Sequence, residues 1–288
     1  MIPGAFEYHR PSSVDDVISL MAQFGDDGRV VAGGHSLIPM MKLRFAEPAH
    51  LIDLAGVGAL KGIDQADGAI VIGAMTTQHE VIQSELLARH CPILGEAAEL
   101  ISDPQVRYCG TIGGNVANGD PANDMPAVMQ CLGASYVLRG PDGERQVAAR
   151  DFYEGTFFTA LGDGELLTAI RIPTPPSGHG HAYEKLKRKV GDYATAAAAV
   201  ILTMDGGRCG QASIALTNLG RTPLWAEAAA AALVGTGLDA AAVASAVALA
   251  REITEPVSDL RGPADYRTHV AGIMVERAIA RARTRAGG

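Results

Sequence analysis

Two short glycine-rich segments, far apart in the sequence, say more about the fold and function of this chain than any other feature. They read Ala32-Gly33-Gly34-His35-Ser36 and Thr111-Ile112-Gly113-Gly114-Asn115. Adjacent glycines adopt positive φ without a Cβ clash and let the backbone approach a ligand closely. Successive N–H groups in such a turn form a concave anion site. The pair therefore predicts a clamp around a diphosphate, with one loop on each side.

The residues around the two motifs leave one alternative open. The first motif could be a tight strand-to-helix turn that uses glycine for its geometry alone. The second motif offers Thr111 and Asn115, whose hydroxyl and amide groups suit phosphate and ribitol oxygens, and nearby Asp120 and Asp124 suit a ribose diol. The usual nucleotide signatures are absent, since neither G-x-G-x-x-G nor G-x-x-x-x-G-K-[ST] occurs.

Composition narrows the class of protein. The 288 residues, 48% hydrophobic and 19% charged, suit one large globular domain or two ordinary ones. The net charge of −8 argues against a nucleic-acid partner, which would need a basic face. The four cysteines are scattered without a C-x-x-C pair, so neither a zinc site nor an iron–sulfur site is signalled.

The first residues of the chain and its apolar stretches indicate where in the cell the protein is expected. The first residues lack the basic and then apolar pattern of a secretory signal. The longest apolar stretches are alanine-rich and too short to span a bilayer. We therefore expect a protein that is not an integral membrane protein and that lies in the cytoplasm, which leaves room for peripheral association with the inner face of the membrane.

The first half of the chain predicts alternating helices and strands. Ser13 and Asp16 have capping-box spacing, and an apolar stripe at helical spacing then runs to Gly25. Thr77 and Glu80 have the same spacing. The expected strands are 29–32, 51–54, 69–73, 135–138 and 166–172. The other expected helices are 37–45, Thr77 to about His90, and Pro92 to 101. The stretch 102–115, with the second glycine motif, is expected to be a polar loop.

The pattern changes at the proline-rich segment 173–178, the best linker candidate. We expect domains at 1–177 and 178–288. In the second domain, strand-like runs at 194–204 and 212–217 flank an Asp-Gly-Gly turn. Helical patterns follow at 224–233, 238–253 and 266–283.

The isolated histidines say little about chemistry. A lone imidazole such as His35, inside the first motif, is more often structural or a phosphate contact than a catalytic base. His179 and His181 lie in or next to the linker and are expected to face solvent.

Lys185, Lys187 and Lys189 would lie on one face of a strand. They indicate either a solvated edge strand or a placement of Lys185 near a cofactor. Tyr193 could stack on a flat ring system, and a core tyrosine is the competing explanation.

Several segments together carry a resemblance to a known family. They are 6–9 with Pro11 and 13–14, then 32–44, 103–107, 111–115, 119–124, 183–189 and 191–194. Over nearly its whole length the chain resembles the FAD-binding medium subunits of the molybdenum hydroxylases. The extension of the first motif and the lysine-rich segment are most similar to carbon monoxide dehydrogenase-type members, a pattern shared with related subunits of unknown substrate.

The resemblance implies an α+β fold. A two-subdomain FAD-binding domain of the vanillyl-alcohol-oxidase (PCMH) type is followed by a small α+β C-terminal domain with an antiparallel sheet and a helical bundle. It also implies one FAD per chain, with its diphosphate between the two glycine loops. Binding would be non-covalent, since no His or Cys stands in a flavin-linking context.

The resemblance also assigns site residues. Asp124 matches an acidic residue near the adenosine end of FAD, and Lys185 and Tyr193 match positions near the isoalloxazine. Lys185 is a candidate for stabilising reduced, anionic flavin. No catalytic or metal-binding residue is implied in this chain. The glycine-motif residues that would contact FAD are Ala32, Gly33, Gly34, His35, Ser36, Thr111, Ile112, Gly113, Gly114 and Asn115.

By resemblance, substrate chemistry belongs to other subunits. A large subunit would oxidise carbon monoxide with water at a molybdenum–pterin centre, with copper. A small subunit would relay electrons through two [2Fe–2S] clusters to FAD in this chain, and FAD would pass them to a quinone or another acceptor. A dimer of such heterotrimers, a heterohexamer, is the expected assembly.

Three alternatives stay open. The complex could oxidise an aldehyde, a purine or nicotinate, because specificity would lie in the large subunit. The chain could be a stand-alone flavin oxidoreductase, although no convincing acid–base set is visible. It could also be a non-enzymatic assembly module.

Overall fold

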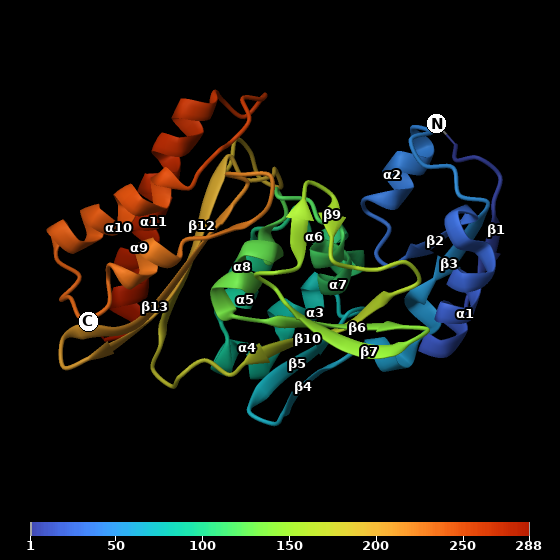
Figure 1. The fold of residues 1–288 in the computed structure, drawn as a ribbon, viewed down its shortest axis with the longest axis horizontal. Helices are drawn as coiled ribbons and strands as arrows, with labels where there is room; N and C mark the ends of the chain where they lie inside the picture. The colour runs from blue at the N-terminus through green and yellow to red at the C-terminus, as the bar shows by residue number, and fades with distance from the viewer. Residues whose placement is uncertain (1, 288) are drawn as a thin grey trace.

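The computed structural model describes residues 2–287. Three larger sheets, each with its own helices, follow one another along the chain (Figure 1). The first sheet has the order β1-β3-β2 and is parallel throughout. Its elements are β1 (Glu7–His9), α1 (Val14–Phe24), β2 (Gly28–Val31), α2 (Leu37–Lys42) and β3 (His50–Asp53).

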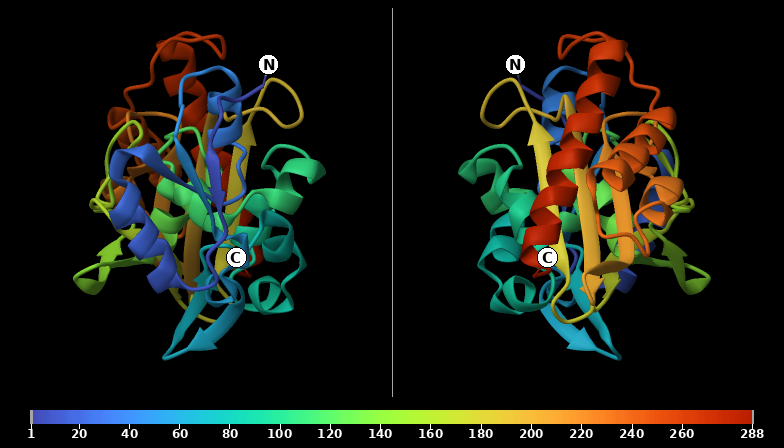
Figure 2. Two further views of the ribbon diagram at one scale, coloured as in Figure 1. Left: turned by 90° about the vertical axis from the view of Figure 1, so that its right-hand side faces the viewer. Right: turned by 90° about the vertical axis from the view of Figure 1, so that its left-hand side faces the viewer.

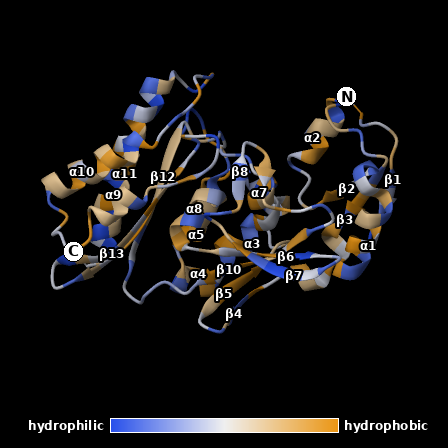
Figure 3. Cartoon of the chain, in the orientation of Figure 1, coloured by the Kyte–Doolittle hydropathy of each residue, from blue (hydrophilic) through white to orange (hydrophobic). Residues whose placement is uncertain are grey.

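The second sheet is antiparallel, with the order β4-β5-β10-β6-β7. Figure 3 shows hydrophobic residues along its central strands and on the helices above them, where the largest core lies. Its strands are β4 (Ile63–Ala66), β5 (Ala69–Gly73), β6 (Ser135–Gly140), β7 (Gly143–Ala148) and β10 (Leu166–Pro173), with the small pair β8 (Tyr153–Gly155) and β9 (Phe158–Thr159). Its helices are α3 (Gln78–Gln83), α4 (Glu85–His90), α5 (Ile93–Glu99), α6 (Pro104–Cys109), α7 (Ile112–Ala117) and α8 (Asp124–Leu132).

The third sheet is antiparallel, with the order β11-β12-β13-β14. Figure 2 shows the last helix lying along it. The elements are β11 (Gly180–Leu186), β12 (Ala196–Asp205), β13 (Arg208–Thr217), β14 (Leu224–Trp225), α9 (Glu227–Ala231), α10 (Ala240–Glu252) and α11 (Ala264–Arg285). No helix within the described part of the chain is both long and apolar enough to cross a membrane.

Strand β12 is buried on both faces, which explains its run of alanines. Ala197 and Ala199 pack into the core of the second sheet, whereas Ala196, Ala198 and Val200 pack with the C-terminal helices. Alternate residues of a strand point to opposite faces, so small side chains let helices approach from both sides. The proline-rich segment 173–178 therefore joins two parts that share a core.

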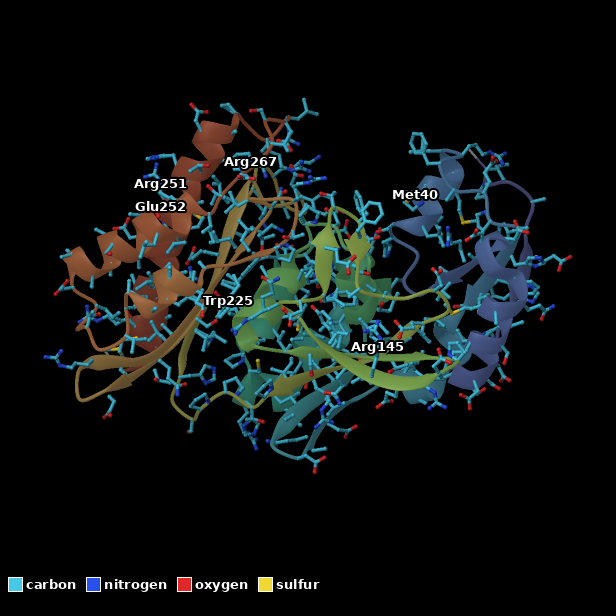
Figure 4. The ribbon with its side chains drawn as sticks, in the orientation of Figure 1. Met40, Arg145, Trp225, Arg251, Glu252 and Arg267 are labelled. Atoms are coloured by element: carbon cyan, nitrogen blue, oxygen red, sulfur yellow. The ribbon has the colours of Figure 1, made fainter. Side chains whose placement is uncertain are left out.

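An aromatic contact and a buried arginine also fix the third part. The guanidinium of Arg150, after β7, lies 3.5 Å from the ring centre of Trp225, and Figure 4 labels Trp225 on the side of the third part that faces the second. Buried Arg267, also labelled there, donates hydrogen bonds to the carbonyls of Thr195, Asn218 and Val257. These bonds tie together the segments that precede β12, follow β13 and follow α10.

Several sequence expectations need correction. The single helix expected from Thr77 to His90 is two helices, because Ser84 adopts extended backbone angles and its hydroxyl caps α4. The expected loop 102–115 contains α6 and α7, which are capped by Asp103 and Thr111. The helix expected from 224 begins only at Glu227, because Leu224–Trp225 pairs with β13.

A polar cluster joins the second and third parts. Glu96 of α5 accepts hydrogen bonds from Arg281 at 2.8 Å and Arg285 at 2.6 Å, both on α11. His181 of β11 lies 3.7 Å from the same carboxylate and is half-buried, so it does not face solvent as expected. His179 is also half-buried, with Nδ1 2.8 Å from the Pro176 carbonyl oxygen. Burial and the nearby Arg285 cation lower the pKa of His181 to about 4.

This shift predicts a pH dependence of stability. In the folded chain the pKa of His181 is about 4, and in the unfolded chain it returns to 6.5. Between pH 6.5 and pH 4 the unfolded chain therefore binds a proton that the folded chain does not, and the free energy of unfolding falls as the pH falls. We expect a loss of about 1–2 kcal/mol over this range, allowing for solvent screening. Urea unfolding between pH 4 and pH 6.5 would measure it. His181→Gln should flatten the slope, and substitution of exposed His269 should leave it unchanged. An equal slope for His181→Gln and wild type would contradict the assignment.

Candidate functional site

The structure brings the two glycine motifs together. A Cβ built on Gly33 would overlap the carbonyl oxygen of Cys109 and lie 2.8 Å from the Cα of Gly110, just before the second motif. A Cβ on Gly114 would lie 3.7 Å from the Cβ of Ala32. The two motifs therefore adjoin, with the connection between β2 and α2 on one side and the start of α7 on the other (Figure 1).

The first motif presents free backbone donors. The amides of Gly33, Gly34, His35 and Ser36 make no hydrogen bond to any of the residues described. Gly34 has φ +74°, which favours glycine, and His35 and Ser36 are exposed. Successive unpaired N–H groups in such a turn form a concave site for an anion. Figure 4 labels exposed Met40 on α2, the helix that follows this motif.

In the second motif, the amides of four of the five residues already donate hydrogen bonds within the chain. Its residues begin α7, whose first turn is fixed by bonds to neighbouring segments. The donor–acceptor pairs are Ile112 to the Thr76 carbonyl at 2.8 Å, Gly113 to the Ala74 carbonyl at 2.9 Å, Asn115 to the Thr111 carbonyl at 3.0 Å, and Gly114 to Thr111 Oγ1 at 3.1 Å. Among the described residues, a row of free amides is therefore found in the first motif, whereas the second motif has four of its five amides paired.

The second motif still contributes close approach and side chains. Gly113 lies so near β5 that a Cβ would come within 2.6 Å of the Ala74 carbonyl oxygen. Gly114 is exposed and turns a bare Cα toward Ala32. Asn115 Oδ1 is buried without a hydrogen-bond partner among the described residues. This side therefore offers a flat backbone surface and an unpaired amide oxygen. The Thr111 hydroxyl is buried and accepts the Gly114 amide, but its own proton can still be donated.

Gln78 is a nearby polar residue that the sequence did not single out. Its backbone amide donates to the Gly110 carbonyl at 2.8 Å, which puts it directly against the second motif. Both polar atoms of its side chain are buried without partners in the described structure. A buried amide without partners costs free energy, so Gln78 is a second unsatisfied group beside the motifs. No local pattern marks such a residue.

Asp124 and Lys185 contact each other in the interior. Asp124 Oδ2 accepts a hydrogen bond from Lys185 Nζ at 2.7 Å, and Oδ1 accepts one from the hydroxyl of Tyr183 at 2.6 Å. Lys185 also donates to the Leu100 carbonyl at 3.2 Å. The two side chains are 5% and 1% exposed. Burial raises the pKa of the Asp124 carboxyl, and the Lys185 ammonium opposes that rise.

This contact conflicts with the positions that the resemblance implied. Two residues in direct contact cannot lie one at the adenosine end and the other at the isoalloxazine end of an extended FAD. Lys185 is also not on a solvated strand face, since its ammonium is buried against Asp124. A compensated ion pair has little net charge to offer a flavin, so the suggested role in stabilising its reduced anion finds no support in this geometry.

Tyr193 lies in the loop before β12. Its side chain is 43% exposed. The guanidinium of Arg261 lies 5.5 Å from its ring centre. Burial, followed by the nearby carboxylate of Asp120, raises the pKa of Tyr193. The exposed ring is available for stacking on a planar group, and Asp120 links it to the loop that follows α7.

The assembled groups fit FAD. The four free amides of the first motif and its exposed Ser36 suit a diphosphate. The unpaired Asn115 side-chain oxygen suits a ligand hydroxyl group. An exposed aromatic ring suits a flavin face. Two hollows of about 290 and 310 Å³, one beside the β6–β7 hairpin and one between α1 and the second sheet, include no residue of either motif.

Comparison with known proteins gives a consistent result. A family model described as the FAD binding domain in molybdopterin dehydrogenase matches residues 4–175. Another, described as the CO dehydrogenase flavoprotein C-terminal domain, matches residues 181–282. The carbon monoxide dehydrogenase medium chain of Afipia carboxidovorans is 64% identical over 99% of each chain.

Two further comparisons cover nearly the whole length of the chain. The carbon monoxide dehydrogenase medium chain of Hydrogenophaga pseudoflava is 48% identical over 97% of each chain. A crystal structure of the Cu,Mo-CO dehydrogenase in its cyanide-inactivated form contains a chain with a TM-score of 0.98 and 64% identity, covering 99% of this chain and 100% of that one.

Proposed function

The chain belongs to the family of FAD-binding subunits of molybdopterin dehydrogenases, and on this premise we propose that it carries FAD within a carbon monoxide-oxidising complex. The complex would convert CO and water to CO₂, two protons and two electrons. The substrate would react on another subunit. The observation that carries the proposal is the row of four free amides in the first motif, packed against the second motif.

Each part of the site would have a separate task in holding FAD. The amides of 33–36 would bind the diphosphate, and the Thr111 hydroxyl and Asn115 side chain would bind oxygens on the opposite side. Ala32, Ile112 and the bare Cα of Gly114 would line the approach. Tyr193 would cover one face of the isoalloxazine and limit its contact with water. FAD, when bound, supplies the redox chemistry between the partner clusters and the acceptor.

Asp124 and Lys185 would act by positioning rather than by touching the diphosphate. Asp124 is the first residue of α8, directly after the loop that carries Asp120, and Lys185 lies on β11. Their ion pair joins the helix layer of the FAD-binding part to the C-terminal sheet. It would therefore keep the Asp120 loop and Tyr193 at a fixed separation.

The finer features of the assembly belong to the same proposal. We propose partners of two kinds, a small iron–sulfur subunit and a large molybdenum–pterin subunit, in a dimer of heterotrimers with a quinone-type acceptor. We also propose a cytoplasmic location and domains at 1–177 and 178–288. The family models, which meet between residues 175 and 181, support that division.

Purification of the intact complex tests the proposal. We expect one releasable FAD per copy of this chain, with copurifying subunits that hold molybdenum, copper and iron. A large subunit with molybdenum that oxidises an aldehyde, a purine or nicotinate, and not CO, would leave FAD binding intact and overturn the substrate. An active monomer would favour a stand-alone oxidoreductase. A complex without flavin would favour an assembly module.

A further inference from the structure

A cluster of metal-ligating side chains lies outside the FAD site, on the face of the first sheet that α1 covers. Glu7 and His9 alternate along β1 and so point to the same face, while Tyr8 points to the opposite face and bonds to Asp53. In the parallel pairing of β1 with β3, Glu7 lies opposite His50. The register therefore places His50 beside both of the β1 side chains.

The ligand atoms of these three residues already converge. His9 Nε2 lies 3.1 Å from His50 Nδ1, and Glu7 Oε2 lies 3.6 Å from the same nitrogen. All three ligand atoms lie within 4.8 Å of one another. Zinc–nitrogen bonds of about 2.0–2.1 Å imply about 3.3 Å between neighbouring ligands of a tetrahedral site. The two imidazoles match this spacing, and the exposed Glu7 side chain needs only a small rotation.

The imidazole rings are held by the surrounding structure. Phe24, at the end of α1, stacks on His50 with ring centres 3.8 Å apart and planes at 8°, and it lies 4.8 Å from the ring of His9. Gly28 of β2, the neighbour of His50 across the sheet, leaves room for Phe24, since a Cβ there would come within 2.9 Å of the Phe24 Cβ. The packing therefore fixes both rings with their nitrogens facing each other.

The set of donors selects one class of ion. The two imidazole nitrogens lie within hydrogen-bond distance of each other, and the Glu7 carboxylate converges on the same point as a third potential ligand. Two imidazoles and one carboxylate are typical ligands of zinc and related divalent transition metals. Calcium and magnesium prefer ligand sets made of oxygen.

We propose that Glu7, His9 and His50 bind a divalent transition metal ion of the zinc type, which fastens β1 to β3. Strand β1 has three residues and lies at the edge of its sheet, with Glu7 and Tyr8 exposed. A metal bound across β1 and β3 would hold the N-terminal segment on the sheet. This inference is independent of the FAD site, which contains none of these residues.

Titration of the full, metal-stripped chain with zinc, measured by isothermal titration calorimetry, tests the site. We expect one zinc per chain, and replacement of His9 or His50 by alanine should weaken binding by about 100-fold or more, since even the loss of an outer-shell partner costs 10–100-fold. Zinc should also slow proteolysis of the segment before α1 in the wild type. His269→Ala, which removes an exposed histidine of the C-terminal part, is the matched control and should bind as the wild type does.

Glu7→Gln keeps the test valid if a histidine variant fails to fold, because the Glu7 side chain is 76% exposed. It should weaken zinc binding at least about 10-fold and leave the thermal midpoint without metal unchanged. The proposal is overturned if the wild type binds no zinc at micromolar concentrations. It is equally overturned if folded Glu7→Gln and His9→Ala bind zinc as tightly as the wild type.

Discussion

Replacing Gly33 with alanine is expected to weaken FAD binding by about 100-fold, the equivalent of one or two lost charge-assisted hydrogen bonds at about 1.5–3 kcal/mol each. The new methyl group would overlap the Cys109 carbonyl oxygen and approach the Cα of Gly110 to 2.8 Å. Both neighbours are backbone atoms, so neither can rotate away. The first motif must move, and its free amides move with it. Flavin fluorescence during FAD titration of the full chain would measure the loss.

Gly95→Ala is the matched control for this substitution. Gly95 lies within α5, and a Cβ there meets nothing within 4 Å. Alanine is a better helix former than glycine, so this variant should be slightly more stable and bind FAD as the wild type does. Circular dichroism and the thermal midpoint of Gly33→Ala would separate a displaced motif from an unfolded chain. Wild-type FAD affinity in a folded Gly33→Ala variant would show that these amides do not hold the cofactor.

Replacing Asp124 with alanine is expected to lower the free energy of unfolding by about 3–5 kcal/mol, the usual cost of leaving one partner of a buried ion pair alone. The Lys185 ammonium would keep only the Leu100 carbonyl as acceptor, and the Tyr183 hydroxyl would lose its short bond to Oδ1. Urea unfolding without FAD would measure the change. Because whole domains are stable by about 5–15 kcal/mol, the variant should remain folded enough for study.

The double variant Asp124→Leu/Lys185→Met shows whether the pair itself is the cause. Removal of both charges should recover much of the loss, because well-packed apolar groups often replace a buried pair at little cost. The coupling energy from the double-mutant cycle should therefore be large. Asp163→Ala, at an exposed carboxylate, should change stability by less than about 0.5 kcal/mol. Single losses below about 1 kcal/mol that add without coupling would contradict the buried pair.

Local signals in the sequence predicted local structure well. Ser13 caps α1 and Thr77 forms a complete capping box with Glu80, as their spacing indicated, because a cap depends only on residues within one turn. Helix α7 was missed because its stability depends on distant residues, whereas α6, which Asp103 caps, carried a local signal that was not used. Gly113 and Gly114, in the first turn of α7, have poor helix propensity, and this turn is stabilised by bonds to Ala74 and Thr76.

The candidate site also has features that the sequence predicted and features that depend on contacts between distant segments. The glycine pairs were readable as ligand-binding turns, and the structure brings them together, but which motif keeps its amides free depends on β5, which lies elsewhere in the sequence. The contact between Asp124 and Lys185 spans 61 residues, so no pattern in either segment reveals it. The metal-ligand cluster likewise depends on the register of β1 with β3.

An experimental structure of the chain with FAD bound tests the central claim most directly. We expect the diphosphate within hydrogen-bond distance, about 2.7–3.2 Å, of amides in 33–36, with Thr111 or Asn115 contacting the cofactor from the other side. The flavin ring should lie against Tyr193. A diphosphate bound away from the first motif, or a flavin lodged in another part of the molecule, would contradict the account.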